Sequence, residues 1–172
     1  MYRAIFLDRD GVINKSVVIR GKPYPPSSID EVEIHETVVE TLIELKSKGY
    51  MLIVVTNQPD VARGTAKKEV VEEINNYLMS SLPIDEIFTC YHDSNHDCNC
   101  RKPKPGSLVD ASIKYKIDLQ KSYMVGDRWR DIDAGISAGC KTVFVDYDYD
   151  EKKPSSYDFK ISKLSELINI VK

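Results

Sequence analysis

Four short groups of polar residues could do chemistry, and each of them follows an apolar run or a loop. They are Asp8-Arg9-Asp10-Gly11, Thr56-Asn57-Gln58, Arg101-Lys102-Pro103 and Gly126-Asp127-Arg128-Trp129-Arg130-Asp131. Aspartate is common in turns, so any one group alone is weak evidence. Together they supply carboxylates, a hydroxyl and fixed cations, which favours one shared site.

The residue types in these groups suit a phosphate ester. Mg²⁺ prefers carboxylate oxygens and reaches phosphate through one or two carboxylates, which Asp8 and Asp127 would supply. Two carboxylates and a phosphate dianion repel one another, so a cation is needed there on charge grounds. Lys102 adds a fixed positive charge and Thr56 a hydroxyl donor. We therefore expect a magnesium-dependent phosphate site.

Asp8 and Asp10 can divide the work of hydrolysis. Side chains two residues apart on an extended strand end point the same way, so both carboxylates would face one substrate. Asp8 would attack phosphorus and form an aspartyl-phosphate. Asp10 would protonate the leaving alcohol and then accept a proton from the hydrolytic water.

Short apolar runs alternate with helical patterns along the chain. Strands are predicted at 3–7, 51–55, 86–90, 123–125, 142–145 and, as an edge strand, 159–161; helices at 37–48, 66–80, 107–116 and 131–138, with a last helix capped by Ser162. The alternation predicts an α/β fold, a doubly wound, Rossmann-like parallel sheet of five to six strands with helices on both faces. Ligands of such folds bind beyond the carboxyl ends of the strands, where the polar groups lie.

Length and composition limit the remaining possibilities. With 172 residues, 42% of them hydrophobic, we expect a single domain over residues 1–172. The net charge of −3, without a basic stripe, argues against a nucleic-acid partner. No apolar run approaches the roughly 18–20 residues that cross a bilayer, and we expect no signal peptide. The chain is therefore expected to be a cytoplasmic monomer that acts on a small molecule.

Three of the four cysteines crowd into one irregular segment. Cys90, Cys98 and Cys100 lie close together with His92 among them, which predicts a metal-binding loop. Cys140 stands alone and is predicted to be a small buried hydrophobic residue.

The four polar groups resemble the four motifs of the haloacid-dehalogenase (HAD) superfamily of phosphatases, in the family's order. Longer phrases are similar to one subgroup, the heptose 1,7-bisphosphate 7-phosphatases and the related histidinol-phosphate phosphatases. They are Phe6-Leu7-Asp8-Arg9-Asp10-Gly11-Val12-Ile13-Asn14, Val55-Thr56-Asn57-Gln58 with Ala62-Arg63-Gly64, Cys100-Arg101-Lys102-Pro103 and Met124-Val125-Gly126-Asp127.

The resemblance implies roles for individual residues. Asp8, Asp10 and Asp127 would surround Mg²⁺, with Asp10 binding through its backbone carbonyl. Contacts to substrate or phosphate are implied for Thr56, Asn57, Gln58, Arg101, Lys102 and Arg128. Arg63 could contact the substrate or be a plain loop residue. Asp131 could hold Lys102 or a metal-bound water, or complement the dipole of the helix that it begins.

The resemblance also implies a structural zinc site. Cys90-x-His92-x5-Cys98-x-Cys100 supplies three thiolates and one imidazole, a complete tetrahedral set for Zn²⁺ with no open position. The family pattern favours His92 over His96 as the fourth ligand. The site would fix the loop that carries Arg101 and Lys102.

The activity implied is removal of the 7-phosphate from D-glycero-D-manno-heptose 1,7-bisphosphate, for nucleotide-activated heptose of lipopolysaccharide and other surface glycans. Arg101 and Arg128 could hold the second phosphate, which favours a sugar bisphosphate. Histidinol-phosphate phosphatase remains open as an alternative, as does a catalytically silent, zinc-stabilised binding module. The presence of Asp8 and Lys102 argues against the silent module.

Two segments, 14–35 and 91–105, lack regular patterning and are predicted to be irregular. Within the first, 15–28 is longer than in many heptose phosphatases. Because this subgroup lacks a large cap domain, that loop would shape the pocket and leaves selectivity open. The acidic run 146–151 lacks calcium-loop spacing and is predicted to be a solvated turn.

Overall fold

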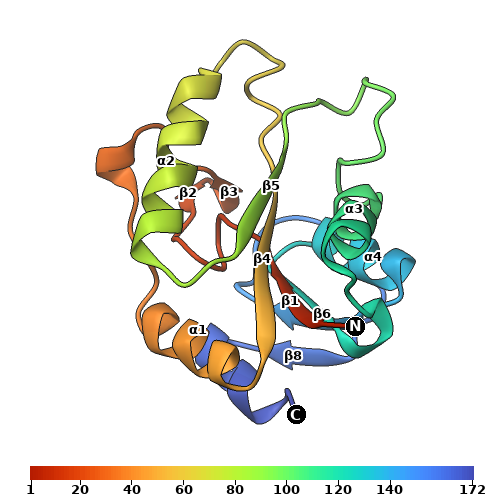
Figure 1. The fold of residues 1–172 in the computed structure, drawn as a ribbon. Helices are drawn as coiled ribbons and strands as arrows, with labels where there is room; N and C mark the ends of the chain where they lie inside the picture. Colours follow the sequence, from red (N-terminus) through yellow and green to blue (C-terminus); the bar gives the residue numbers. More distant parts are fainter.

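The computed structural model describes residues 1–172 and is built around a six-stranded parallel sheet (Figure 1). The strands are β1 (Arg3–Leu7), β4 (Tyr50–Asn57), β5 (Glu86–Cys90), β6 (Tyr123–Gly126), β7 (Lys141–Val145) and β8 (Phe159–Ile161). Their order is β5-β4-β1-β6-β7-β8. The chain thus builds outward from β1 in both directions, which confirms the doubly wound sheet and places its switch point at β1.

Two helices cover each face of the sheet. Figure 1 shows α1 (Val38–Ser47) and α2 (Lys68–Ser81) on one face, and α3 (Gly106–Tyr115) and α4 (Trp129–Ala138) on the other. Helix α1 buries Leu42 and Leu45 in the larger apolar cluster, whereas α3 buries Leu108 in the smaller one. Each fully buried leucine contributes roughly 1.5–3 kcal/mol. The central strands read as unbroken apolar runs because both of their faces are covered.

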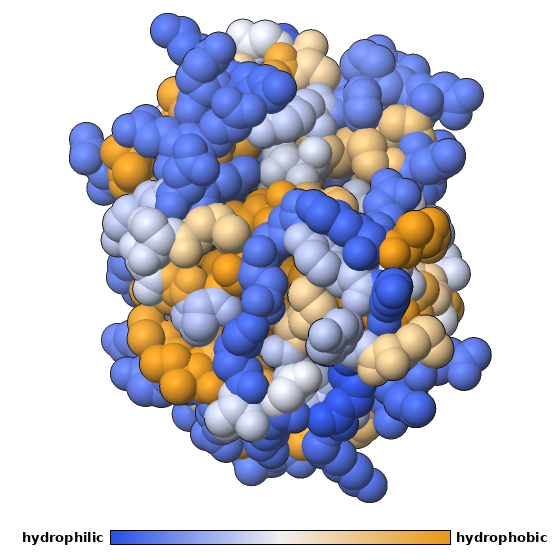
Figure 2. Space-filling model, in the orientation of Figure 1, coloured by the Kyte–Doolittle hydropathy of each residue, from blue (hydrophilic) through white to orange (hydrophobic).

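Several features outside the sheet agree with the sequence. Cys140 is buried in the smaller apolar cluster, as predicted. None of the helices has both the length and the apolar character needed to cross a bilayer. In the view of Figure 2, hydrophilic residues dominate the loops above the sheet, and apolar residues gather mainly below them.

The segment predicted to be irregular contains a β-hairpin. Strands β2 (Val17–Ile19) and β3 (Lys22–Tyr24) pair antiparallel through the two-residue turn Arg20-Gly21. Both turn residues have positive φ, 51° and 76°, as a two-residue hairpin turn requires. This hairpin is hard to predict, because Arg is an uncommon residue at the first of these positions and Pro23 argues against a strand.

Two smaller differences concern helices. The last segment is a 3₁₀ helix, η3 (Leu164–Asn169), and the hydroxyl of Ser162 donates to the side chain of Glu166 instead of capping the backbone. The polar Asn75 of α2 is buried, whereas the aromatic Tyr77 is exposed. Short 3₁₀ turns also occur at η1 (Ile29–Glu31) and η2 (Leu119–Lys121).

Candidate active site

A buried ion-pair network lies at the carboxyl ends of β1 and β6. Lys102 is only 2% exposed, and its Nζ lies 2.7 Å from Asp8 Oδ1 and 2.7 Å from Asp131 Oδ1. The same ammonium donates to the carbonyl oxygen of Val55 at 2.7 Å. These three acceptors match the three donors of an ammonium group, so the charge is buried with all of its donors used. Of the roles left open for Asp131, two contacts are observed: its Oδ1 pairs with Lys102, and its Oδ2 accepts a hydrogen bond from the Arg128 N–H at 3.0 Å at the start of the helix.

Three buried carboxylates share this single cation. Asp8 follows β1, Asp127 follows the neighbouring strand β6, and Asp131 begins the first turn of α4; one oxygen of each lies within 4.8 Å of the others. Burial and the charge of Asp131 raise the pKa of Asp8 to about 6, against the opposing effect of Lys102. Burial, together with Asp8 and Asp131, raises the pKa of Asp127 well above its usual range. The cluster therefore has an excess of negative charge that a second cation would offset.

The surroundings of Asp127 fit Mg²⁺. Its Oδ2 accepts a hydrogen bond from the Tyr149 hydroxyl at 2.9 Å, whereas its Oδ1 is buried without any partner. An unpaired buried carboxylate oxygen is costly, and a metal ion held between Asp8 and Asp127 would satisfy it. Gly11 allows this approach, since a Cβ there would lie 2.0 Å from Asp127 Oδ2. The residues present thus suit a hard divalent cation.

The carboxyl group of Asp10 is held by donors on several sides. Arg9 donates to it through Nε at 3.1 Å and through a terminal nitrogen at 3.2 Å. The amides of Asn14 and Gln58 donate at 3.0 Å and 2.8 Å. Arg9 is fully buried and also donates to Asn75 at 2.9 Å. Asp10 is therefore fixed at the edge of the cavity, and Arg9, to which the sequence analysis gave no role, supports it.

The second polar group, at the end of β4, divides between the cavity and its support. Thr56 and Asn57 line the cavity, whereas Gln58 is buried. The side-chain amide of Asn57 donates to the carbonyl of Lys102 at 3.0 Å and accepts from its N–H at 3.1 Å. The Gln58 amide donates to Thr56 Oγ1 at 2.9 Å as well as to Asp10. In this structure Asn57 and Gln58 hold other site residues in place.

A cavity of about 240 Å³ opens above the network, and only one of its 17 lining residues is hydrophobic. Its basic residues are Lys22, Arg63, Arg101, Lys102, Arg128 and Arg130. Arg63 pairs with Asp93 at 2.7 Å, and Arg128 pairs with Glu151. Arg101 and Arg130 have no acidic side chain within ion-pair distance, and burial together with Arg128 lowers the pKa of Arg130. The cavity thus offers uncompensated positive charge beyond Lys102.

Two segments outside the four polar groups reach the site, and the first of them lines the cavity. The β2–β3 hairpin contributes Lys22 and Tyr24. The run 146–151 differs from the solvated turn that was predicted, because Tyr149 reaches Asp127 and Glu151 reaches Arg128. Its only signal in the sequence was a pair of tyrosines, which are unusual in a fully solvated turn.

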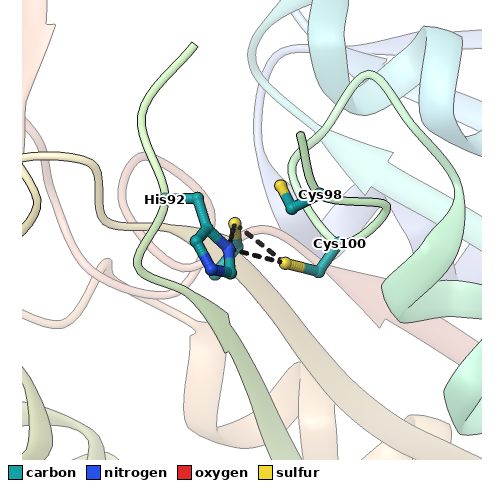
Figure 3. Close-up of side chains that lie close together, drawn as sticks. His92, Cys98 and Cys100 are labelled. Atoms are coloured by element: carbon teal, nitrogen blue, oxygen red, sulfur yellow. Dashed lines mark hydrogen bonds between the residues drawn. The ribbon is translucent and has the colours of Figure 1, made fainter. Parts of the chain in front are cut away.

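A second cluster of possible metal ligands lies beyond the end of β5. Figure 3 shows the side chains of His92, Cys98 and Cys100 gathered together, and Cys90 completes the group. Cys100 Sγ lies 3.1 Å from Cys90 Sγ and 3.3 Å from His92 Nδ1, and the four ligand atoms all lie within 4.8 Å. A tetrahedral Zn²⁺ with bonds of about 2.0–2.3 Å requires ligand atoms at about this spacing. The four residues therefore fit zinc.

His96 lies beside this cluster but outside it. Its Nδ1 accepts a hydrogen bond from the backbone N–H of Asp93 at 3.0 Å, so that nitrogen is already engaged. The cluster ends at Cys100, directly before Arg101 and Lys102, and Ser107 donates to the carbonyl of Cys100 at 3.1 Å. An ion held there would stiffen the loop that delivers Lys102.

Comparisons with known proteins agree with this geometry. The model of the haloacid dehalogenase-like hydrolases matches residues 26–139. The D-glycero-beta-D-manno-heptose-1,7-bisphosphate 7-phosphatase of Helicobacter pylori is 34% identical, over 99% of this chain and 98% of its own length. The enzyme of that name from Haemophilus influenzae is 40% identical, over 82% of this chain and 79% of its own. The crystal structure of D,D-heptose 1.7-bisphosphate phosphatase from B. bronchiseptica, complexed with magnesium and phosphate, superposes with a TM-score of 0.81 and 26% identity, over 98% of this chain and 97% of that one.

Proposed function

We propose that this chain, which belongs to the haloacid dehalogenase-like hydrolases and is a phosphatase, removes the 7-phosphate from D-glycero-D-manno-heptose 1,7-bisphosphate. The observation that carries the proposal is the buried network in which Lys102 lies 2.7 Å from both Asp8 and Asp131, at the bottom of a cavity rich in cations. The relatives are named for the beta anomer, so we expect that anomer to be preferred. The reaction would serve the synthesis of nucleotide-activated heptose.

Asp8 is the proposed nucleophile. Lys102 holds one oxygen of its carboxylate at 2.7 Å, which orients the other oxygen for attack on phosphorus. The P–O bond to the sugar breaks as the bond to Asp8 forms, giving an aspartyl-phosphate. Asp10 donates a proton to the leaving sugar oxygen and then accepts one from the water that releases phosphate.

Charge in the site would be balanced by cations of two kinds. A bound Mg²⁺ would screen the phosphoryl oxygens from the carboxylates of Asp8 and Asp127, with the backbone carbonyl of Asp10 as a further ligand. Lys102 and the hydroxyl of Thr56 face the same phosphate. We place the second phosphate of the substrate against Arg101 and Arg128 at the cavity wall, with Arg63 near the rim.

The zinc cluster is proposed to be structural. Three thiolates and one imidazole leave no ligand position free for a substrate. The cluster lies immediately before Arg101 and Lys102, so we assign it the task of holding these two cations in the cavity.

Release of inorganic phosphate tests the function. Both anomers of heptose 1,7-bisphosphate and histidinol phosphate would be compared, with Mg²⁺ and after its removal. Asp8→Asn should abolish release, whereas Asp110→Asn, an exposed carboxylate on α3, should retain it. We expect one phosphate released per heptose, only with Mg²⁺.

The other outcomes contradict separate parts of the proposal. Preference for histidinol phosphate would keep the chemistry and overturn the substrate. Release that persists in Asp8→Asn would overturn the nucleophile. No release from any of these compounds would favour a binding module.

A further inference from the structure

The loop after β7, residues 146–151 and here called the β7 loop, makes three polar contacts with residues in and around the site. The Tyr149 hydroxyl donates to Asp127 Oδ2 at 2.9 Å. Glu151 forms an ion pair with Arg128. The N–H of Asp150 donates to the carbonyl of Gly21 in the β2–β3 turn at 3.0 Å. One short loop thus touches a candidate metal ligand, a candidate substrate ligand and the hairpin.

We propose that Tyr149 is a positioning residue for the metal site, whose hydroxyl holds the Asp127 carboxylate with Oδ1 directed at the ion. This inference rests on the proposed function, because it takes Asp127 as a ligand of Mg²⁺. Its direct support is the asymmetry of the two carboxylate oxygens. Oδ2 is engaged by Tyr149, and Oδ1 is buried with no partner.

A carboxylate in this place needs an external support. The terminal torsion of an aspartate side chain is broad and roughly two-fold, so the carboxylate has little preference of its own. Repulsion from Asp8 and Asp131, whose nearest oxygens lie within 4.8 Å, would turn it away from the metal position. The hydrogen bond from Tyr149 opposes that rotation before the ion arrives. Partners of this kind behind metal ligands typically change metal affinity by 10–100-fold.

The alternative is that the Tyr149 ring only fills space beside Asp127. A phenylalanine would then serve equally well, because it keeps the ring and loses only the hydroxyl. The β7 loop provides a matched control in Tyr147, whose hydroxyl lies 3.5 Å from His35 Nε2 and forms no hydrogen bond with Asp127.

The test is Mg²⁺ titration by isothermal calorimetry, without substrate, on the zinc-loaded wild-type protein, Tyr149→Phe and Tyr147→Phe. We expect Tyr149→Phe to weaken Mg²⁺ binding about tenfold and Tyr147→Phe to change it less than about twofold. Urea unfolding without Mg²⁺ should show both variants folded at the temperature of titration. The two variants could lose the same amount of stability while only Tyr149→Phe loses Mg²⁺ affinity. That result would show that the Tyr149 hydroxyl positions Asp127 and that the side chain does more than fill space.

The remaining outcomes decide the inference independently of the sugar. Equal Mg²⁺ affinity in Tyr149→Phe and the wild type would overturn it. Wild-type protein that binds no Mg²⁺ would overturn both the inference and the proposed function. Weakened binding in Tyr149→Phe, combined with no hydrolysis of heptose bisphosphate by the wild type, would support the inference and overturn only the substrate.

Discussion

Stability of the magnesium-free protein should fall as pH rises through the range in which Asp8 ionises. The pKa of Asp8 is about 6 in the folded protein, against 3.8 for the free side chain, because of burial and then the charge of Asp131. The folded state therefore binds this proton more tightly than the unfolded state between those values. Under that condition the free energy of unfolding decreases as pH increases, from about pH 4 to above pH 6. The difference between the two pKa values of Asp8 corresponds to a total change of about 3 kcal/mol in the free energy of unfolding.

Urea denaturation measures this pH dependence of stability. The wild type and Asp8→Asn would be unfolded without Mg²⁺ at several pH values from 4.5 to about 7.5. The asparagine does not titrate, so the difference between the two proteins reports Asp8 together with its coupling to Asp127. Groups that the substitution does not touch cancel, such as His35, whose pKa is lowered by burial. We expect the stability of the wild type, relative to Asp8→Asn, to fall by about 2 kcal/mol across this range, because the rest of the total change lies below pH 4.5. Adding Mg²⁺ should stabilise the wild type more at the upper pH, because the ligands must be ionised to bind.

Parallel stability curves for the two proteins would refute this reasoning. They would mean that Asp8 has the same proton affinity in the folded and unfolded chains. A wild type that gains stability over Asp8→Asn as pH rises would show that Lys102 outweighs burial and Asp131.

Two further predictions concern the cation beneath the cavity and the zinc cluster. Lys102→Met leaves Asp8 and Asp131 buried without their cation, so we expect phosphatase activity to be lost. We also expect the free energy of unfolding without Mg²⁺, measured with urea, to fall by about 3–5 kcal/mol. Unchanged stability would contradict the network. Cys100→Ser should lose the bound zinc and, with it, most of the activity. The control Cys140→Ser, in the apolar core, should retain the metal. Elemental analysis of the purified chain measures the zinc content of both. Equal zinc content in the two variants would remove Cys100 from the ligand set.

The sheet could be predicted from the sequence because its central strands are covered on both faces. Residues 3–7 of the central strand β1 read as a strand and have those limits in the structure, as do residues 86–90 of the edge strand β5. Parallel strands also bring their carboxyl ends to one edge. Polar groups that follow different strands could therefore be expected to converge, and Asp8, Lys102 and Asp131 do.

The walls of the cavity could not be predicted in the same way. The hairpin turn at Arg20-Gly21 lacks the Asn-Gly or Asp-Gly signal of such turns. The contact between Tyr149 and Asp127 joins loops after two different strands and leaves no periodic pattern. Polar side chains that meet only through tertiary packing are visible in the structure alone.

The site therefore has two parts with different physical constraints. The Lys102 network is buried, and each of its charges depends on the others, so a change in one leaves the rest unpaired. The hairpin meets the β7 loop through backbone atoms at Gly21 and Asp150, and the exposed Lys22 and Tyr24 side chains on it face the cavity. Backbone contacts tolerate changes of side chain, so the hairpin can alter which leaving group fits while the phosphate chemistry beneath it stays intact. Selectivity can thus vary in the hairpin without a change in the buried network.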